Sequence, residues 1–289
     1  MKIGIHGSVW VAGWSEPECR EALERTRAAG YDFIEVPLLD PDTVDAAMTA
    51  RLLGEVGLEA TTSLGLNLAA DVSSDDPEIV SRGEELLDRA LAVSKEIGAS
   101  HMTGILYGAL NKHPAPLTDA GRRNSVTAVR RLVDKAREAG VALGLEAVNR
   151  YESNMLNTAE QVLSYLDEVG ADDVSVHLDT YHMNVEESDL RSAVRACGDR
   201  LGYVHVGENN RGFLGSGSID FPGLFRELVQ IGYDGPLAFE SFSSAVVSED
   251  FTAALAIWRD FWQDGGPIAE HARRFIDEQL EAARAATGA

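Results

Sequence analysis

The sequence predicts a single-domain (β/α)₈ TIM barrel, on three observations. Strand-like and helix-like segments alternate along the whole chain, which indicates parallel strands joined by crossover helices. Eight such units in 289 residues match the usual size of this barrel. Glycine directly follows most of the helix-like segments, where a left-handed residue commonly caps a helix before the next strand.

The predicted strands are short apolar runs, and each one after the first follows a helix after a tight connection. They lie at 2–6, 33–36, 59–64, 101–103, 141–146, 174–179, 201–205 and 236–240. The predicted helices carry apolar residues at helical spacing. They lie at 16–29, 43–56, 77–97, 118–139, 158–169, 190–197, 222–231, 252–262 and 268–285.

The segments that follow the strands are long, in contrast to those that follow the helices. They are 7–15, 65–76, 104–117, 147–157, 180–189 and 206–221. Long loops on one face of a rigid scaffold are where binding residues usually lie. The functional site is therefore expected at the carboxyl ends of the strands, which is the rim where barrel enzymes have their active sites.

No linker-like or low-complexity tract divides the chain, so we predict one catalytic domain over residues 1–289 that ends in C-terminal helices. An open, doubly wound sheet is the alternative architecture. It would call for a glycine-rich phosphate loop after the first strand, and the residues there, HGSVW at 6–10, do not form one.

The amino-acid composition limits the kinds of molecule that this protein is expected to bind. The net charge is −22, with 47 acidic and 25 basic residues, and such a surface repels nucleic acid and anionic membranes. No apolar run approaches the roughly 18 residues of a membrane span, and the N-terminal segment lacks the apolar stretch of a signal peptide. Cys19 and Cys197 form neither a disulfide framework nor a zinc motif. We expect a cytoplasmic protein with a small-molecule substrate and neither nucleic acid nor membrane as a partner.

Four polar residues each close a short apolar strand: Glu146, Asp179, His205 and Glu240. A charged group at the end of a buried strand is costly unless something pairs with it. Three carboxylates and one imidazole form a hard, mostly oxygen ligand set, which suits six-coordinate Mn²⁺, Mg²⁺ or Co²⁺. The pattern predicts one divalent metal ion held by these four side chains.

Two coordination positions would remain for substrate oxygens, such as the C2 carbonyl and C3 hydroxyl of a ketose. The metal would then acidify the C3–H bond, and a base must lie within hydrogen-bond reach of that proton. Glu146 and Glu240 come from opposite strands and could face the two sides of C3. One would remove the proton, and the other would return it to the opposite face.

Each of these residues taken singly also has an ordinary structural explanation, because an acidic residue at a strand end is often a helix cap or an ion-pair partner. Glu35 and Glu59 lie within strand-like segments, which favours a structural role for both. His182 falls on the catalytic rim. His177, two residues before Asp179, either supports a metal ligand or fills the barrel interior.

The stretches around the strand ends carry more specific motifs. They read GLEAVNRYE at 144–152, HLDTYHMNVEE at 177–187, HVGENNR at 205–211 with the turn GSG at 215–217, and GYDG at 232–235 leading to FESF at 239–242. These motifs resemble those of the ketose 3-epimerases, the tagatose and allulose (psicose) epimerases. The resemblance covers the second half of the chain densely, and the first half agrees in pattern.

The resemblance implies roles for individual residues. The metal ligands would be Glu146, Asp179, His205 and Glu240, and the first and last of these would be the acid–base pair. Contacts to the O1, O2 and O3 end of the sugar would come from Glu152, His182 and Arg211. Trp14 would be a wall residue of the pocket, and Gly104 would leave room for the substrate. Family members are commonly homodimers or homotetramers.

Two departures from the family concern the far end of the sugar. Relatives often have an aromatic residue at the end of the first strand, where this chain has His6 followed by glycine. They also often have a tryptophan in the loop after the fourth strand, where this chain reads LYGAL at 106–110. We expect His6 to contact the far end of the sugar, and the chemistry of the family to transfer more surely than its sugar preference.

We therefore predict a metal-dependent ketose 3-epimerase that acts on free ketohexoses through an enediolate. Fructose and allulose would be the prominent pair, with tagatose, sorbose and ketopentoses as further substrates. Hydroxypyruvate isomerases, inosose dehydratases and sugar-phosphate epimerases share the scaffold and are the enzyme alternatives. A phosphate would call for a basic cluster or a glycine nest, and the rim loops contain only Lys112, Arg150 and Arg211.

Two further alternatives are weaker. The endonuclease IV group also has this scaffold, but it needs more histidines for several zinc ions and a basic face for DNA. The charge of −22 argues against it. A non-catalytic sugar-binding barrel would keep the sugar contacts without needing two glutamates at a metal, and metal content would separate it from an enzyme.

Overall fold

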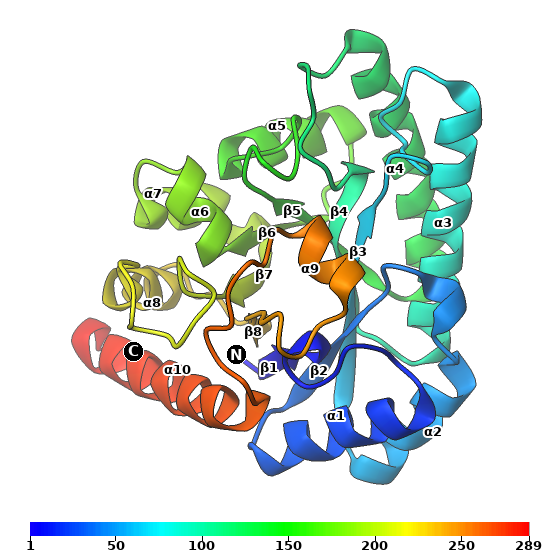
Figure 1. The fold of residues 1–289 in the computed structure, drawn as a ribbon. Helices are drawn as coiled ribbons and strands as arrows, with labels where there is room; N and C mark the ends of the chain where they lie inside the picture. Colours follow the sequence, from blue (N-terminus) through cyan, green and yellow to red (C-terminus); the bar gives the residue numbers. More distant parts are fainter. Residues whose placement is uncertain (289) are drawn as a thin grey trace.

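The strands close into one parallel barrel in which the spatial order follows the chain (Figure 1). The computed structural model describes residues 1–288, so residue 289 of the predicted domain lies outside it. The strands are β1 (Ile3–His6), β2 (Phe33–Pro37), β3 (Glu59–Leu66), β4 (His101–Ala109), β5 (Ala142–Ala147), β6 (Ser175–Asp179), β7 (Leu201–Val206) and β8 (Leu237–Phe239). β8 pairs in parallel with β1, which closes the sheet and confirms the predicted barrel.

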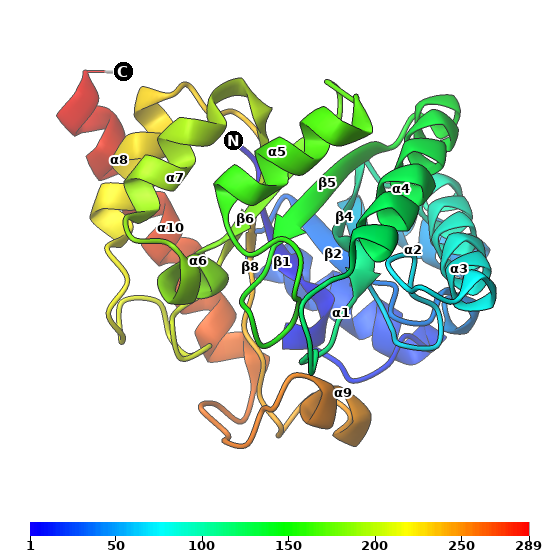
Figure 2. The same ribbon diagram turned by 90° about the horizontal axis from the view of Figure 1, so that it is seen from above.

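Helices surround the barrel, and one of them covers its open end. The helices are α1 (Glu16–Ala28), α2 (Ala46–Val56), α3 (Pro77–Glu96), α4 (Asp119–Ala139), α5 (Ala159–Val169), α6 (Thr180–Glu186), α7 (Leu190–Cys197), α8 (Phe221–Gln230), α9 (Glu249–Ala254) and α10 (Gly265–Thr287). Figure 1 shows α9 over the mouth of the barrel, and Figure 2 shows it at one end, apart from the outer ring.

Local capping sets where the helices begin and end. Thr118 and Thr158 precede α4 and α5, and each side chain accepts a hydrogen bond from a backbone N–H of the first turn. Gly140 and Gly170 follow the same helices in the left-handed conformation, with φ of 71° and 72°. Each helix therefore stops abruptly, and a tight turn leads into the next strand. The long connections are left for the opposite rim.

The structure differs from the sequence-based elements at two strand ends. β4 continues to Ala109, where the sequence predicted a strand over 101–103 and then a loop. Tyr107 explains the extension, because its ring is buried and its hydroxyl donates to the carbonyl of Glu146 at 2.8 Å. The predicted loop 180–189 contains α6, which Asp179 caps by accepting from the N–H of Tyr181 at 2.9 Å. The extension of β4 thus depends on a contact with the neighbouring strand β5, whereas the start of α6 depends on a local cap.

The helix predicted over 252–262 is also wrong in its extent. α9 spans Glu249–Ala254, and Ala256 has a φ of +53°, which a continuing helix does not allow. Beyond it, Trp258 is 73% exposed, whereas Trp262 is buried and donates through Nε1 to the Ser241 hydroxyl at 2.8 Å. One aromatic residue anchors this segment to the barrel, and the other faces outward.

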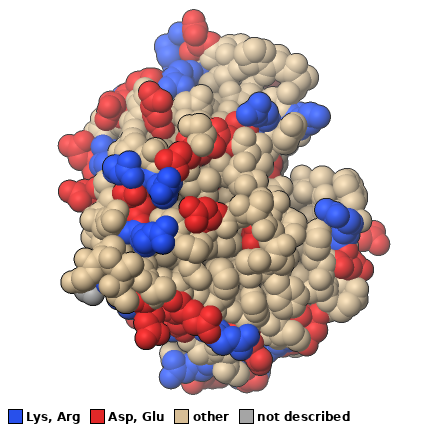
Figure 3. Space-filling view, turned by 90° about the vertical axis from the view of Figure 1, so that its left-hand side faces the viewer, with Lys and Arg blue, Asp and Glu red and all other residues tan. Residues whose placement is uncertain are grey.

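The exterior carries charges of both signs. On the face shown in Figure 3, basic side chains lie beside acidic ones and do not form a broad patch of their own. Within residues 1–288, every helix is too short or too polar to cross a bilayer.

Gly104 on β4 gives the first testable prediction. Its φ is +112°, and an added Cβ would lie 2.3 Å from the carbonyl oxygen of Leu64. Gly104→Ala should lower the free energy of unfolding by about 1–3 kcal/mol in urea titrations, because it combines backbone strain with a clash against main chain. Gly54→Ala in α2 is the control, since a Cβ there meets nothing within 4 Å and should be neutral or stabilising by up to about 1 kcal/mol. Wild-type stability of Gly104→Ala would contradict this account.

Candidate active site

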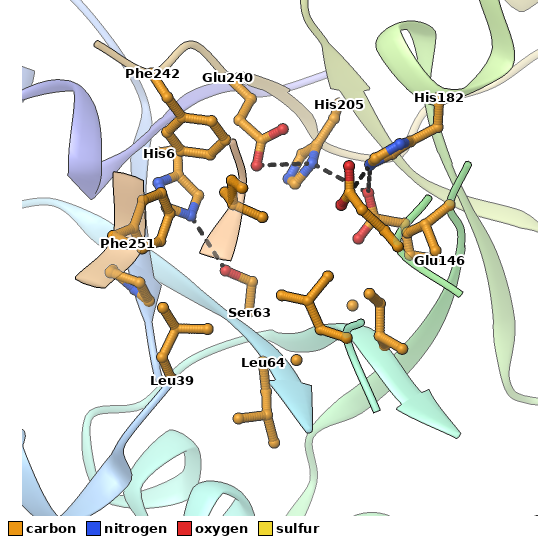
Figure 4. Close-up of a pocket in the computed structure, with 18 of the residues that line it drawn as sticks. His6, Leu39, Ser63, Leu64, Glu146, His182, His205, Glu240, Phe242 and Phe251 are labelled. Carbon is orange, nitrogen blue, oxygen red and sulfur yellow. Dashed lines mark hydrogen bonds and ion pairs between the residues drawn. The ribbon is translucent and has the colours of Figure 1, made fainter. Parts of the chain in front are cut away.

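A cavity of about 80 Å³ lies at the rim formed by the carboxyl ends of the strands. Eight of the ten predicted site residues line it: His6, Gly104, Glu146, Glu152, His182, His205, Arg211 and Glu240. In Figure 4 Glu146, His182, His205 and Glu240, which come from β5, α6, β7 and the residue after β8, point toward one another on one side. Leu39, Leu64 and Phe251 line the other side. The cavity thus has a polar half and an apolar half.

The four strand-end residues meet in the polar half. Asp179 and His205 are paired neighbours at the ends of β6 and β7, and both are buried. Glu146 comes from β5, and Glu240 directly follows β8. The Nδ1 atom of His205 lies 3.7 Å from Oε1 of Glu146 and 3.5 Å from Oε1 of Glu240, so the imidazole lies between the two glutamates.

The polar atoms of this cluster fit a divalent cation. Among residues 1–288, Oδ2 of Asp179, Nδ1 of His205 and Oε2 of Glu240 are buried and make no hydrogen bond, although Arg211 forms ion pairs with the two carboxylate oxygens. Potential ligand atoms of these three residues lie within 4.8 Å of one another, and Glu146 makes a similar group with His177 and His205. Buried polar atoms are rarely left without hydrogen bonds, and a cation bound here would coordinate the imidazole nitrogen as well as the carboxylates.

Arg211 supplies positive charge to the same cluster. Its guanidinium lies 2.9 Å from Oδ2 of Asp179 and 2.5 Å from Oε2 of Glu240, and it stacks 4.0 Å above the ring of Tyr181. Its backbone φ is +57°, and the hydroxyl of Ser241 donates to its carbonyl. A strained backbone held in this way is often found at functional sites. The conformation aims the side chain from its loop into the cavity.

His182 is arranged as a neutral hydrogen-bond donor. Its Nδ1 accepts from the backbone N–H of Asn149 at 3.2 Å and from the amide of the same residue at 2.8 Å, so Nε2 carries the proton. Nε2 lies 3.6 Å from Oε1 of Glu146 and 3.6 Å from Oδ2 of Asp179. Burial lowers the pKa of His182 to about 3. A protonated Nε2 cannot bind a metal, which favours donation to an oxygen bound in the cavity.

Glu152 contacts both Asn149 and His182. Its Oε1 accepts from the amide of Asn149 at 2.8 Å, and its Oε2 lies 3.9 Å from Nε2 of His182. Burial raises the pKa of the Glu152 carboxyl above its usual value. Asn149 was not among the predicted site residues. Its place in the loop directly after β5 was the only signal for it in the sequence.

His6 and Trp14 lie on different cavities. His6 lines the main cavity, and its Nδ1 accepts from the N–H of Ser8 at 3.2 Å, so a protonated Nε2 lies 3.4 Å from the hydroxyl of Ser63. Trp14 instead lines an adjoining chamber of about 370 Å³, with its Nε1 donating to Thr49 at 3.1 Å. The two cavities share Leu39 and other wall residues. Trp14 is therefore a wall residue of the chamber beyond the main cavity.

Two buried residues lie beneath the cluster. Glu35, for which the sequence favours a structural role, has its Oε2 2.8 Å from Nε2 of His205. The ring of His177 meets the ring of His205 edge-on, with centroids 4.2 Å apart. An acidic residue in the middle of an apolar strand was the signal that could have drawn attention to Glu35. By contrast, Glu59 is exposed and forms an ion pair with Lys2 at 2.5 Å.

Known proteins share this arrangement of fold and sequence. Residues 23–279 match the xylose isomerase-like TIM barrel family. The chain is 48% identical over 282 residues to a ketose 3-epimerase of Arthrobacter globiformis, which covers 98% of both chains. It is 47% identical over 279 residues to an L-ribulose 3-epimerase of Methylomonas sp. (strain DH-1), covering 96% of this chain and 98% of that one. The chain belongs to the ketose 3-epimerases of this barrel family.

Solved structures agree with this placement. The crystal structure of a Methylomonas D-allulose 3-epimerase in complex with D-allulose superposes with a TM-score of 0.95 at 46% identity. It covers 96% of this chain and 97% of that chain. The resemblance found in the sequence motifs is thereby confirmed for the whole chain, and the protein is an isomerase of the carbohydrate epimerase class.

The protonation of Glu146 gives a prediction for the metal-free protein. Burial, reinforced by the charges of Glu240 and Asp179, raises the pKa of Glu146 from 4.5 to about 8. The folded state then holds this proton more tightly than the unfolded chain does. This group therefore makes the free energy of unfolding fall as the pH rises from about 4.5 to about 8. Glu146→Gln carries no such proton and should become more stable relative to wild type over that range.

The measurement is urea unfolding of both proteins in EDTA at several pH values across this window. Parallel pH dependences of wild type and Glu146→Gln would contradict the raised pKa. Addition of Mn²⁺ to the wild type should remove most of the difference, because a cation stabilises the ionised carboxylate.

Proposed function

We propose that this protein is a divalent-metal-dependent ketose 3-epimerase that interconverts free ketoses at C3. One observation carries the proposal. Four side chains from the ends of β5, β6, β7 and β8 meet in one buried cluster, in which one atom each of Asp179, His205 and Glu240 has no hydrogen-bond partner among residues 1–288. The carboxylates of Glu146 and Glu240 both lie beside Nδ1 of His205. That arrangement supports both a metal and a pair of bases.

In this proposal Glu146, Asp179, His205 and Glu240 hold the ion. When bound, the ion would polarise the C2 carbonyl of the ketose and so acidify the C3–H bond. Glu146 and Glu240 would act as the acid–base pair: one takes the C3 proton to leave an enediolate, and the other delivers a proton to the opposite face. The direction of epimerisation decides which glutamate acts first.

The different surroundings of the two glutamates support this division. Burial raises the pKa of Glu146 to about 8. Burial also acts on Glu240, but Arg211, His205 and His6 outweigh it and lower the pKa of Glu240 below its usual value. A pair of carboxyl groups with pKa values pushed apart can hold one proton between them, as a two-base reaction requires.

Glu152, His182 and Arg211 would anchor the first three carbons of the sugar. Each lies within the same cavity, and His182 offers an Nε2–H donor while Arg211 offers a fixed guanidinium. Groups held this firmly can orient a substrate as well as bind it. Gly104 would leave space beside them, since its position tolerates no side chain.

The far end of the sugar would meet His6 and the apolar half of the cavity. Leu39, Leu110 and Phe251 line both the main cavity and the adjoining chamber. Apolar contacts to one carbon unit discriminate by only about 1–3 kcal/mol, so several free ketoses should be accepted. Arg211 is the one basic residue among the cavity-lining residues within 1–288, which disfavours a phosphorylated substrate.

The proposal also includes the identity of the metal ion, the oligomeric state and the cellular compartment. Oxygen-rich ligands favour Mn²⁺, Mg²⁺ or Co²⁺ over a structural zinc. Exposed Trp258 and Phe261 offer an apolar surface that a homodimer or homotetramer could bury. Cys19 and Cys197 are both free, in keeping with a reducing cytoplasm.

Metal removal and a substrate panel test the proposal as a whole. Protein treated with EDTA should lose activity on fructose and allulose, and activity should return with Mn²⁺, Co²⁺ or Mg²⁺. Chromatography should show turnover of several free ketoses, tagatose and ribulose among them, with fructose–allulose interconversion prominent. Full activity of rigorously metal-free protein would reject the metal. A ketose phosphate that greatly outperforms every free ketose would favour a sugar-phosphate epimerase.

Isotope exchange tests the two bases. Wild-type enzyme in D₂O should place deuterium at C3 of the product, because the proton passes through a protein carboxyl group. Glu146→Gln and Glu240→Gln should each lower kcat by at least about 100-fold, the usual scale for loss of a general acid or base. Glu59→Gln is the matched control on the surface and should keep wild-type turnover. Unlabelled product together with active Gln variants would reject the two-base scheme.

A further inference from the structure

Glu35 on β2 is a buried carboxylate whose role the proposed reaction leaves open. Its side chain is fully buried, and Oε2 receives two donors. One is Nε2 of His205 at 2.8 Å, and the other is the hydroxyl of Tyr203 at 2.5 Å. The Tyr203 oxygen in turn lies 2.8 Å from the hydroxyl of Thr61 on β3. A chain of hydrogen bonds thus crosses the barrel interior and ends on an imidazole.

The geometry sets the direction of the hydrogen bond between Glu35 and His205. Oε2 of Glu35 accepts the phenolic proton of Tyr203 at 2.5 Å and also lies 2.8 Å from Nε2 of His205. An oxygen that accepts from both neighbours requires Nε2 of His205 to carry the proton of the second hydrogen bond.

This hydrogen bond fixes which nitrogen of His205 faces the cavity. Nδ1 points away from Glu35 and lies between the carboxylates of Glu146 and Glu240, at 3.7 and 3.5 Å. It is buried and has no hydrogen-bond partner among residues 1–288. Rotation of the ring by half a turn would break the hydrogen bond to Glu35 and leave its buried oxygen without the imidazole donor, which is unfavourable.

Glu35 itself is on the wrong side of the ring to bind the same ion. Its contact is to Nε2, whereas the other predicted ligands surround Nδ1. It also belongs to none of the groups of residues whose ligand atoms converge within 4.8 Å in the described part of the chain. Its influence on the cluster must therefore pass through the imidazole.

We propose that Glu35 is a positioning residue that holds His205 in the Nε2–H tautomer and orients its Nδ1 for metal binding, with Tyr203 holding Glu35 in turn. This inference rests on the proposed metal-dependent function. A carboxylate that accepts from the second nitrogen of a ligating histidine fixes the ring and raises its basicity. Loss of such a partner typically weakens metal affinity about 10–100-fold.

The test measures Mn²⁺ affinity directly, by isothermal titration calorimetry and by the electron paramagnetic resonance signal of free Mn²⁺. Glu35→Gln keeps the shape of the side chain and removes its charge. We expect its Mn²⁺ affinity to fall about 10–100-fold, with kcat restored in large part at saturating Mn²⁺. Tyr203→Phe should show a smaller loss in the same direction. Glu59→Gln, on the exposed start of β3, should bind as the wild type does.

The outcomes separate this inference from the proposed function. Wild-type protein that binds Mn²⁺ and epimerises ketoses, with a Glu35→Gln variant of equal Mn²⁺ affinity, would overturn the inference alone. Wild-type protein that binds no Mn²⁺ would overturn both. Urea unfolding of the metal-free variants shows whether an affinity loss reflects unfolding.

A second measurement needs no variant. In ¹⁵N-labelled wild-type protein loaded with Zn²⁺, nuclear magnetic resonance should show His205 protonated at Nε2 and metal-bound at Nδ1. This result would support the inference even if Glu35→Gln fails to fold. A proton on Nδ1, with the metal on Nε2, would overturn it.

Discussion

Buried negative charge is the constraint on which the rest of this molecule depends. The carboxylates concerned are those of Glu35, Glu146, Asp179 and Glu240, all buried at one end of the barrel. Like charges in a poorly hydrated space repel one another strongly, and each carboxylate takes up a proton unless a cation or donors compensate it. His205 donates to Glu35, which lies beneath the cluster, and Arg211 lies against Asp179 and Glu240. A divalent cation would complete the balance.

The residues of the charged cluster come from strand ends, whereas the residues proposed to contact the sugar come from loops and from α6. The cluster residues come from strand ends, where the hydrogen-bonded ladder holds the backbone and keeps the carboxylates from moving apart. Glu152, His182 and Arg211, which are proposed to bind the sugar, come from the segments after β5, β6 and β7. Local contacts, and not strand pairing, hold them in place. Asn149 holds Glu152 and His182. Arg211 is directed by its positive φ, and its guanidinium stacks on the ring of Tyr181.

Local rules were sufficient to predict the architecture. Apolar periodicity located the strands, and glycines such as Gly140 and Gly170 marked the helix ends, because capping depends only on the residues next to it. The same rules gave wrong element bounds where contacts with distant segments determine how far a strand or helix extends. β4 continues to Ala109, where Tyr107 donates to the main chain of β5. The helix predicted over 252–262 ends at Ala254, and Trp262 beyond it is anchored to the barrel.

The sequence by itself determined that Glu146, Asp179, His205 and Glu240 end successive strands, and a parallel barrel brings all such ends to one rim. It could not determine which side chains touch across the interior. Glu35 and His205 are 170 positions apart in the chain, and they meet only because closure of the barrel through β8 and β1 brings β2 and β7 around the same core. Trp14 lines the adjoining chamber for the same kind of reason, since the position of a loop side chain depends on the elements it packs against. The residues at strand ends can be predicted from the local sequence pattern. The partner of a buried charge cannot, because it is brought close only when the barrel closes.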